Sequence, residues 1–188
     1  MFWPFGRMRR VVRILPVAIL ERGDAFCRQM NEIRKSIHTP ESGIQIYEPY
    51  LYGYWCYTMA VRNSKFSVYQ QGKLILLCNA AITKLFEIDF QHASATTGKL
   101  SDRDSENSKM LGPAIFDRLH EYDAKFNEVK VHSWNYNIDD TIFWRPITLL
   151  FSELFVGRDE GMNFYLSNFP VIDLLAMQTF KAAYSDLR

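Results

Sequence analysis

The chain has 188 residues, which is a usual size for one domain and is enough to bury a core of its own. Its formal net charge of +1 argues against a general nucleic-acid-binding protein, which carries a clear excess of basic residues. Aromatic residues make up 15% of the chain, and because such residues dominate interface energetics, the surplus predicts that some of them face a partner protein.

The first predicted element is a basic N-terminal arm, residues 1–22, which has no acidic residue before Glu21. Its apolar positions recur at the spacing of one helix face and are Met8, Val11, Val12 and Leu15. Its basic positions fall on the opposite face and are Arg9, Arg10 and Arg13. This pattern is typical of organelle targeting or of a helix lying on an anionic membrane, and an ordinary first helix with solvated arginines is the alternative.

We expect the arm to be kept rather than cleaved, because the sequence starts with it at Met1. We also expect it to be held against a partner protein or an anionic lipid surface, since free termini usually fray. The aromatic start, Phe-Trp-Pro-Phe, predicts anchors inserted into that partner or interface. The predicted contact residues of the arm are Phe2, Trp3, Phe5, Arg7, Arg9, Arg10 and Arg13.

The rest of the chain, residues 23–188, is predicted to be one helical domain. Pro16 predicts the end of the helix in the arm, since proline disrupts a helix interior. A second helix is predicted over residues 25–37, with Asp24 as its N-cap and Pro40 just beyond its end.

The tyrosine-rich segment within residues 44–70 allows two interpretations. Its composition favours strands, and Asn63-Ser64 would suit the turn of a small β-hairpin. Glu48-Pro49 instead predicts a helix start with proline at its first position, and this helix is the favoured interpretation. Since tyrosine can bury its ring and keep its hydroxyl wet, contacts with a partner or a membrane are predicted for Tyr50, Tyr52, Tyr54 and Trp55.

The segment 73–90 is predicted to be the central apolar helix of the fold. Its apolar residues surround the helix except for a thin polar strip, which is formed by Asn79, Thr83, Lys84 and Glu87. Lys84 and Glu87 interrupt the apolar run too early for a membrane span. The predicted fold class is therefore mainly α, a single helical domain around this helix with an extended basic arm.

Residues 91–109 are almost all polar and have no periodicity. Such a segment cannot bury an apolar face, and long loops in compact domains are often bound to a partner. The sequence therefore predicts an exposed polar strap that lies on a neighbouring subunit.

A helix is predicted from Pro113 to about Glu128, and it carries Asp117 and His120 three positions apart. This is the spacing of helical metal sites, so a small helical metalloenzyme is one hypothesis. Di-iron bundles need the motif twice, with further carboxylates, and the sequence has no second copy. A hydrated polar face is the favoured interpretation, and no metal, cofactor or catalytic residue is predicted.

The C-terminal part is predicted to begin with an extended piece, 129–134, followed by a helix over 141–155 that Gly157 ends. Pro146 is expected to kink or restart this helix. Trp144 and Arg145 are predicted contact residues, through a cation–π pair or a lipid phosphate.

The two acids before that helix, Asp139 and Asp140, suit a helix N-terminus better than a catalytic pair, because adjacent side chains project in different directions. The sequence GRDEG predicts a turn. A last helix is predicted to start near Asn168, with Pro170 in its first turn.

The sequence carries no glycine-rich phosphate loop, nucleophile elbow or metalloprotease motif. Its three cysteines, Cys27, Cys56 and Cys78, are widely spaced, which argues against a disulfide framework and a zinc ribbon. It also lacks an N-x-S/T sequon, which favours an intracellular or organellar setting.

These features predict a non-catalytic accessory subunit that acts through protein–protein and membrane-surface contacts. The arginine-rich, acid-free arm favours a peripheral position on the mitochondrial inner membrane, where respiratory and ATP synthase complexes are the natural hosts. A phage or viral structural protein is the first alternative, and the metalloenzyme is the second.

Overall fold

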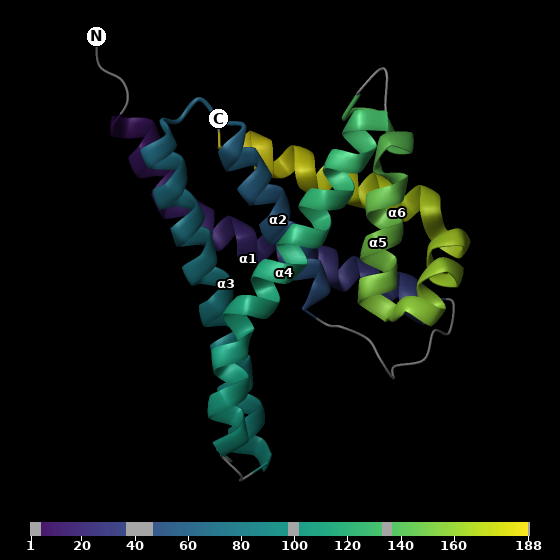
Figure 1. Cartoon of the computed structure of the whole chain (residues 1–188), viewed down its shortest axis with the longest axis horizontal. Coiled ribbons are helices and arrows are strands. Elements are labelled where there is room, and N and C mark those ends of the chain that lie inside the picture. The colour runs from purple at the N-terminus through teal and green to yellow at the C-terminus, as the bar shows by residue number, and fades with distance from the viewer. Residues whose placement is uncertain (1–4, 37–46, 98–101, 133–136, 188) are drawn as a thin grey trace.

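The computed structural model describes residues 5–36, 47–97, 102–132 and 137–187, and these ranges form helices and connecting turns without a strand. The helices are α1 (Phe5–Ser36), α2 (Glu48–Arg62), α3 (Val68–Thr97), α4 (Asp102–His132), α5 (Thr141–Val156) and α6 (Arg158–Asp186). The predicted mainly α fold class is thus confirmed, and Figure 1 shows the helices grouped around α2.

Helix α2 is the centre of the fold, because it contacts each of the other five helices. All but three of its 15 residues are buried. The prediction that 73–90 forms the central helix was therefore wrong. Helix α3 buries one stripe, which consists of Leu74, Cys78, Ile82 and Phe86, and its Leu76 side chain is 67% exposed.

The β-hairpin interpretation of residues 44–70 was wrong, and the favoured helix from Glu48 is confirmed within one residue at its end. Pro49 lies in the first turn, where its missing N–H costs no hydrogen bond. A strand would alternate buried and exposed side chains, but Tyr52, Tyr54 and Tyr57 are covered on different sides of α2.

Two prolines that were expected to end or begin helices lie inside helices instead. Helix α1 continues through Pro16 to Ser36, so Asp24 is an interior residue rather than an N-cap. Its carboxylate accepts a hydrogen bond from the Tyr50 hydroxyl. Helix α4 likewise begins at Asp102 and continues through Pro113. A proline removes one backbone hydrogen bond, and burial of Leu15 and Ile19 on both sides of Pro16 offsets that loss.

The described part of the predicted strap at 91–109 is helical, because 91–97 belong to α3 and 102–109 to α4, and its contact with a neighbouring subunit stays a prediction. In Figure 1 the end of α3 and the start of α4 extend together away from the body of the molecule. The polar composition of this segment fits a helical hairpin that needs little buried surface. The extended piece expected at 129–134 is also helical, up to His132.

The C-terminal helices α5 and α6 pack closely against each other, and some of their ends lie where the sequence predicts them. Asp140 caps α5 by accepting a hydrogen bond from the Ile142 backbone N–H at 2.9 Å. Gly157, at φ 96°, ends α5 as predicted, since this left-handed conformation suits glycine. The segment expected to be a turn is the start of α6, which bends at the non-helical Asn168, where a helix start was predicted.

Two glycine substitutions are expected to change stability in opposite directions. A Cβ at Gly161 would lie 2.4 Å from the Glu153 Cα, so Gly161→Ala should push α5 and α6 apart and destabilise the protein by roughly 1–3 kcal/mol. Gly72→Ala on α3 meets no atom within 4 Å and should stabilise it by about 0.5–1 kcal/mol. Urea unfolding of both variants measures the difference, and equal effects would contradict the close packing of α5 on α6.

Candidate functional site

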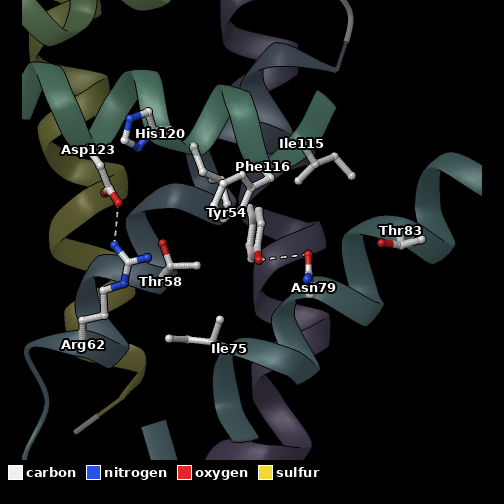
Figure 2. Close-up of a pocket in the computed structure, with 11 residues that line it drawn as sticks. Tyr54, Thr58, Arg62, Ile75, Asn79, Thr83, Ile115, Phe116, His120 and Asp123 are labelled. Carbon is white, nitrogen blue, oxygen red and sulfur yellow. Dashed lines mark hydrogen bonds and ion pairs between the residues drawn. The ribbon is translucent and has the colours of Figure 1, made fainter. Parts of the chain in front are cut away.

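An open cleft of about 390 Å³ lies where α2, α3 and α4 meet, and we call it the α2–α4 cleft. Figure 2 shows its residues, which come from one face of each helix. Helix α2 contributes Tyr54, Thr58 and Arg62, and α3 contributes Ile75, Asn79 and Thr83. Helix α4 contributes Ile115, Phe116, Leu119, His120 and Asp123.

Regular helical spacing brings these side chains together. Tyr54, Thr58 and Arg62 follow one another at every fourth residue, so they line one side of α2 along its second half. The same spacing places the three α3 residues in a row that faces α4. The cleft therefore depends on three helix faces that are far apart in the sequence.

The polar end of the cleft is organised by Asp123. One of its carboxylate oxygens accepts a hydrogen bond from the Trp55 indole N–H at 2.9 Å, and the other is 2.6 Å from the Arg62 guanidinium. Both carboxylate oxygens are thus engaged within the protein. The Arg62 side chain remains 48% exposed, so part of its guanidinium can reach a further group.

The two remaining hydroxyl groups near the centre of the cleft also have internal partners. The Tyr54 hydroxyl donates to the Asn79 side-chain oxygen at 3.1 Å. The Thr58 hydroxyl donates to the Trp55 carbonyl oxygen at 2.8 Å. The carbonyl oxygen of the Asn79 amide is therefore occupied, while its NH2 group donates to no group in the part of the chain that the structure describes.

The walls of the cleft are apolar. Ile115 is buried and Ile75 and Leu119 are half-buried, so they provide a dry surface between the polar groups. Phe116 stands at the opening and is 70% exposed. A concave site with apolar walls and few polar groups is the usual form of a small-molecule pocket.

A second polar cluster joins α2 to α4 and is centred on the buried carboxylate of Glu48. Glu48 is 1% exposed, accepts a hydrogen bond from the Tyr122 hydroxyl at 2.5 Å, and lies 3.2 Å from the Arg118 guanidinium. Burial raises the pKa of Glu48 to about 7, against the opposing effects of Arg118 and Tyr122. Because Glu48 is buried and its partners Arg118 and Tyr122 join α2 to α4, we assign the cluster a structural role.

A similar cluster around Asp173 joins α5 to α6. Its carboxylate accepts hydrogen bonds from the Thr148 hydroxyl at 2.5 Å and from the Tyr165 hydroxyl at 3.1 Å. Arg145 lies 3.7 Å away, and burial raises the pKa of the Asp173 carboxyl. The Arg145 guanidinium also sits 5.2 Å from the centre of the Phe169 ring, a cation–π arrangement within this chain.

The aromatic residues that were predicted to contact a partner lie mostly inside this chain. Tyr52, Tyr54, Trp55 and Trp144 are each no more than 1% exposed, and Tyr50 is half-buried over Gly23. The core packs these rings against one another, so it accounts for much of the aromatic surplus without a second protein.

The basic arm has a covered apolar face and an open basic face. Val11 and Leu15 are buried, and α1 contacts α2, α3 and α6. The basic side chains, which point outward, are Arg9, Arg10 and Arg13. Phe2 and Trp3, as well as the side chains of Phe5 and Arg7, lie outside the described residues.

The hypothetical metal site is not assembled. Asp117 and His120 are both exposed, and the described residues contain no group of three or more histidine, cysteine or acidic side chains that could hold a metal ion. Over the same described ranges, none of the helices is sufficiently long and apolar to cross a membrane.

The α2–α4 cleft itself was missed by sequence reasoning. The sequence predicts Asn79 and Thr83 as part of a thin polar strip on an apolar helix, and in the structure these two residues line the side of α3 that faces the cleft. The signal available in the sequence was the spacing of Asn79 and Thr83, which are four residues apart and therefore lie on one side of an otherwise apolar helix. No known family pattern, no curated protein and no solved structure matches this chain.

Proposed function

We propose that this protein is a non-catalytic accessory subunit that lies on an anionic membrane surface and contacts other subunits of a larger assembly. The observation that carries the proposal is the arrangement of α1, where Val11 and Leu15 are packed into the protein and Arg9, Arg10 and Arg13 remain exposed. Cations grouped on one face are attracted to anionic headgroups.

This arrangement favours contact by charge rather than by insertion. An amphipathic helix that inserts into a membrane needs a free apolar face, and on α1 Val11 and Leu15 are buried by the chain itself, which leaves only Val12 of that face exposed, at 40%. The mitochondrial inner membrane is our proposed location, because the arginine-rich, acid-free start of the chain is typical of that organelle. Respiratory or ATP synthase complexes are the proposed hosts.

Contacts with neighbouring subunits would use exposed apolar side chains on the outer helices. Several large hydrophobic residues on α3 and α4 are more than two-thirds exposed. These are Val68, Tyr69, Leu76, Phe116 and Val131. Because their side chains are open to solvent, they are available for protein contacts.

Replacement of Arg9, Arg10 and Arg13 by glutamine is expected to weaken binding to anionic vesicles about a hundredfold at low salt. Each arginine near such a surface contributes roughly 1 kcal/mol, and about 1.4 kcal/mol corresponds to tenfold in affinity. The measurement is co-sedimentation with vesicles of phosphatidylcholine and 30% cardiolipin, with vesicles of phosphatidylcholine alone for comparison.

The matched control replaces Lys65, Lys73 and Lys84, which are also exposed but lie near or on α3. This control removes the same charge and should retain most of the binding. Equal losses in the two triple variants would mean that net charge alone is responsible, and absence of binding by the unchanged protein would refute the membrane contact.

The assembly is tested separately by sedimentation of the protein from gently solubilised membranes of the cells that make it. The proposal expects migration with other subunits, well above the mass of a single chain. Migration as a monomer in the cytosol would refute it, whereas ordered self-assembly of the purified chain would favour the viral structural alternative.

A further inference from the structure

We propose that the α2–α4 cleft binds a small molecule that combines a compact apolar body with one carboxylate group. This inference is independent of the membrane contact, because the cleft involves α2, α3 and α4 and no residue of α1. It is carried by the volume of the cleft, by its apolar walls and by the hydrogen-bonding groups that remain available in it.

The volume and walls limit the size of the occupant. A cavity of about 390 Å³ is at the lower end of the range of pockets that hold small organic ligands. Ile75, Ile115 and Leu119 provide apolar surface along it, and the Tyr54 ring lies between Ile75 and Ile115 in Figure 2. An aromatic ring with a short alkyl chain would fit such a space and displace water from these side chains.

The available polar groups define the chemistry of the occupant. Both oxygens of Asp123 and the side-chain oxygen of Asn79 already accept hydrogen bonds from protein groups. The charged and amide groups that keep unused donors are the rest of the Arg62 guanidinium and the Asn79 NH2 group, and the hydroxyl of Thr83 can either donate or accept. A ligand that offers acceptors satisfies these groups, and one that offers only donors does not.

The charge at the polar end favours a carboxylate. The indole N–H of Trp55 and the guanidinium of Arg62 together offset the charge of Asp123, and the 48% exposed guanidinium can accept a second anionic partner. His120 lines the same end in Figure 2 and adds an imidazole N–H. An amine would lie beside the guanidinium, and the Asp123 carboxylate that could attract it already holds Arg62 and Trp55.

The direct test compares three probes of equal size, namely 4-phenylbutyrate, its amide and 4-phenylbutylamine. The carboxylate is expected to bind with a dissociation constant of roughly 0.1–1 mM, which is reasonable for about twelve heavy atoms. The amide and the amine should bind at least tenfold more weakly. Titration followed by NMR chemical shifts gives both the affinity and the location on the full chain.

Two substitutions locate the interaction. Arg62→Gln should weaken 4-phenylbutyrate binding at least tenfold, because it removes the charged donor. Phe116→Ala should weaken binding about threefold, and since Phe116 is 70% exposed this change leaves the fold intact. Arg28→Gln, an exposed arginine on α1, is the matched control and should bind as the unchanged protein does.

The results that overturn the proposal are specific. Equal affinity for the carboxylate and the amide would refute the charge argument, and unchanged binding in Arg62→Gln would refute the role of Arg62. Shift changes confined to residues outside α2, α3 and α4, or no binding at 10 mM probe, would refute the site.

Discussion

Trp55→Ala is expected to lower the free energy of unfolding by roughly 3–5 kcal/mol, the range for removal of a large buried aromatic side chain. Trp55 is 0% exposed and lies on α2, the helix that contacts all others. Its ring centre is 5.5 Å from that of Tyr122, 5.7 Å from that of Phe126 and 6.1 Å from that of Phe180. Loss of the ring therefore leaves a cavity bounded by α2, α4 and α6.

Trp55→Phe separates the contribution of the aromatic ring to stability from that of the indole hydrogen bond. This variant keeps an aromatic ring but removes the indole N–H that donates to Asp123, so it should cost only about 1–2 kcal/mol. Tyr69→Ala is the surface control, because Tyr69 is 71% exposed, and it should change stability by less than about 0.5 kcal/mol. Urea unfolding followed by circular dichroism measures all three, and a similar small effect at Trp55 and Tyr69 would contradict the central position of α2.

Arg118→Gln is expected to destabilise the protein by roughly 1–2 kcal/mol at pH 8, because Glu48 without a cation keeps its proton and the stabilisation of its ionised form beside Arg118 is lost. Glu48 is 1% exposed, and the Arg118 guanidinium lies 3.2 Å from it. The second partner of Arg118, Glu121, is 42% exposed and contributes little. The destabilisation should fall below about 1 kcal/mol at pH 5, where Glu48 is protonated.

The free energy of unfolding of the unchanged protein should also decrease as the pH rises, because Glu48 must lose its proton. The pKa of Glu48 is raised from its ordinary value of 4.5 to about 7 by burial. Since the folded state holds this proton more tightly, the favourable contribution is complete below pH 4.5 and is lost as the pH rises through 7. The loss is about 3 kcal/mol, and the raised pKa of Asp173 acts in the same direction.

A double-mutant comparison identifies the group responsible. Glu48→Gln should flatten the stability profile between pH 4.5 and 7, and it should remove the pH dependence of the Arg118→Gln effect. Equilibrium denaturation at pH 5, 6, 7 and 8 supplies the profiles. An Arg118→Gln effect that is equal at pH 5 and pH 8 would show that the charge of Glu48 is not involved.

The sequence predicted helices wherever short-range signals and packing agree. Pro49 at a first turn, Asp140 at an N-cap and Gly157 after the last turn each mark a helix end in the structure. These signals work because they act within a few residues, through one hydrogen bond or one backbone conformation. The helical fold class followed from them.

The same short-range rules predicted wrong helix boundaries where contacts with distant segments outweigh the local cost of a proline. Pro16 and Pro113 should each interrupt a helix, yet α1 and α4 continue through them. The loss of a hydrogen bond at Pro16 is offset by burial of side chains against α2, α3 and α6, and nothing within the local sequence shows that these helices will be present.

Local pattern alone established that this chain is helical, where several of its helices start and stop, and that one face of α1 is basic. Which helix is central, and which side of α3 is open, depended on the packing of distant segments. The tyrosines of α2 predicted contacts with a partner or a membrane, but the hydroxyl groups of Tyr52 and Tyr54 and the carboxylate of Glu48 find partners on α6, α3 and α4. A polar group can be buried only when such a partner is in place, and no single segment of the sequence contains both.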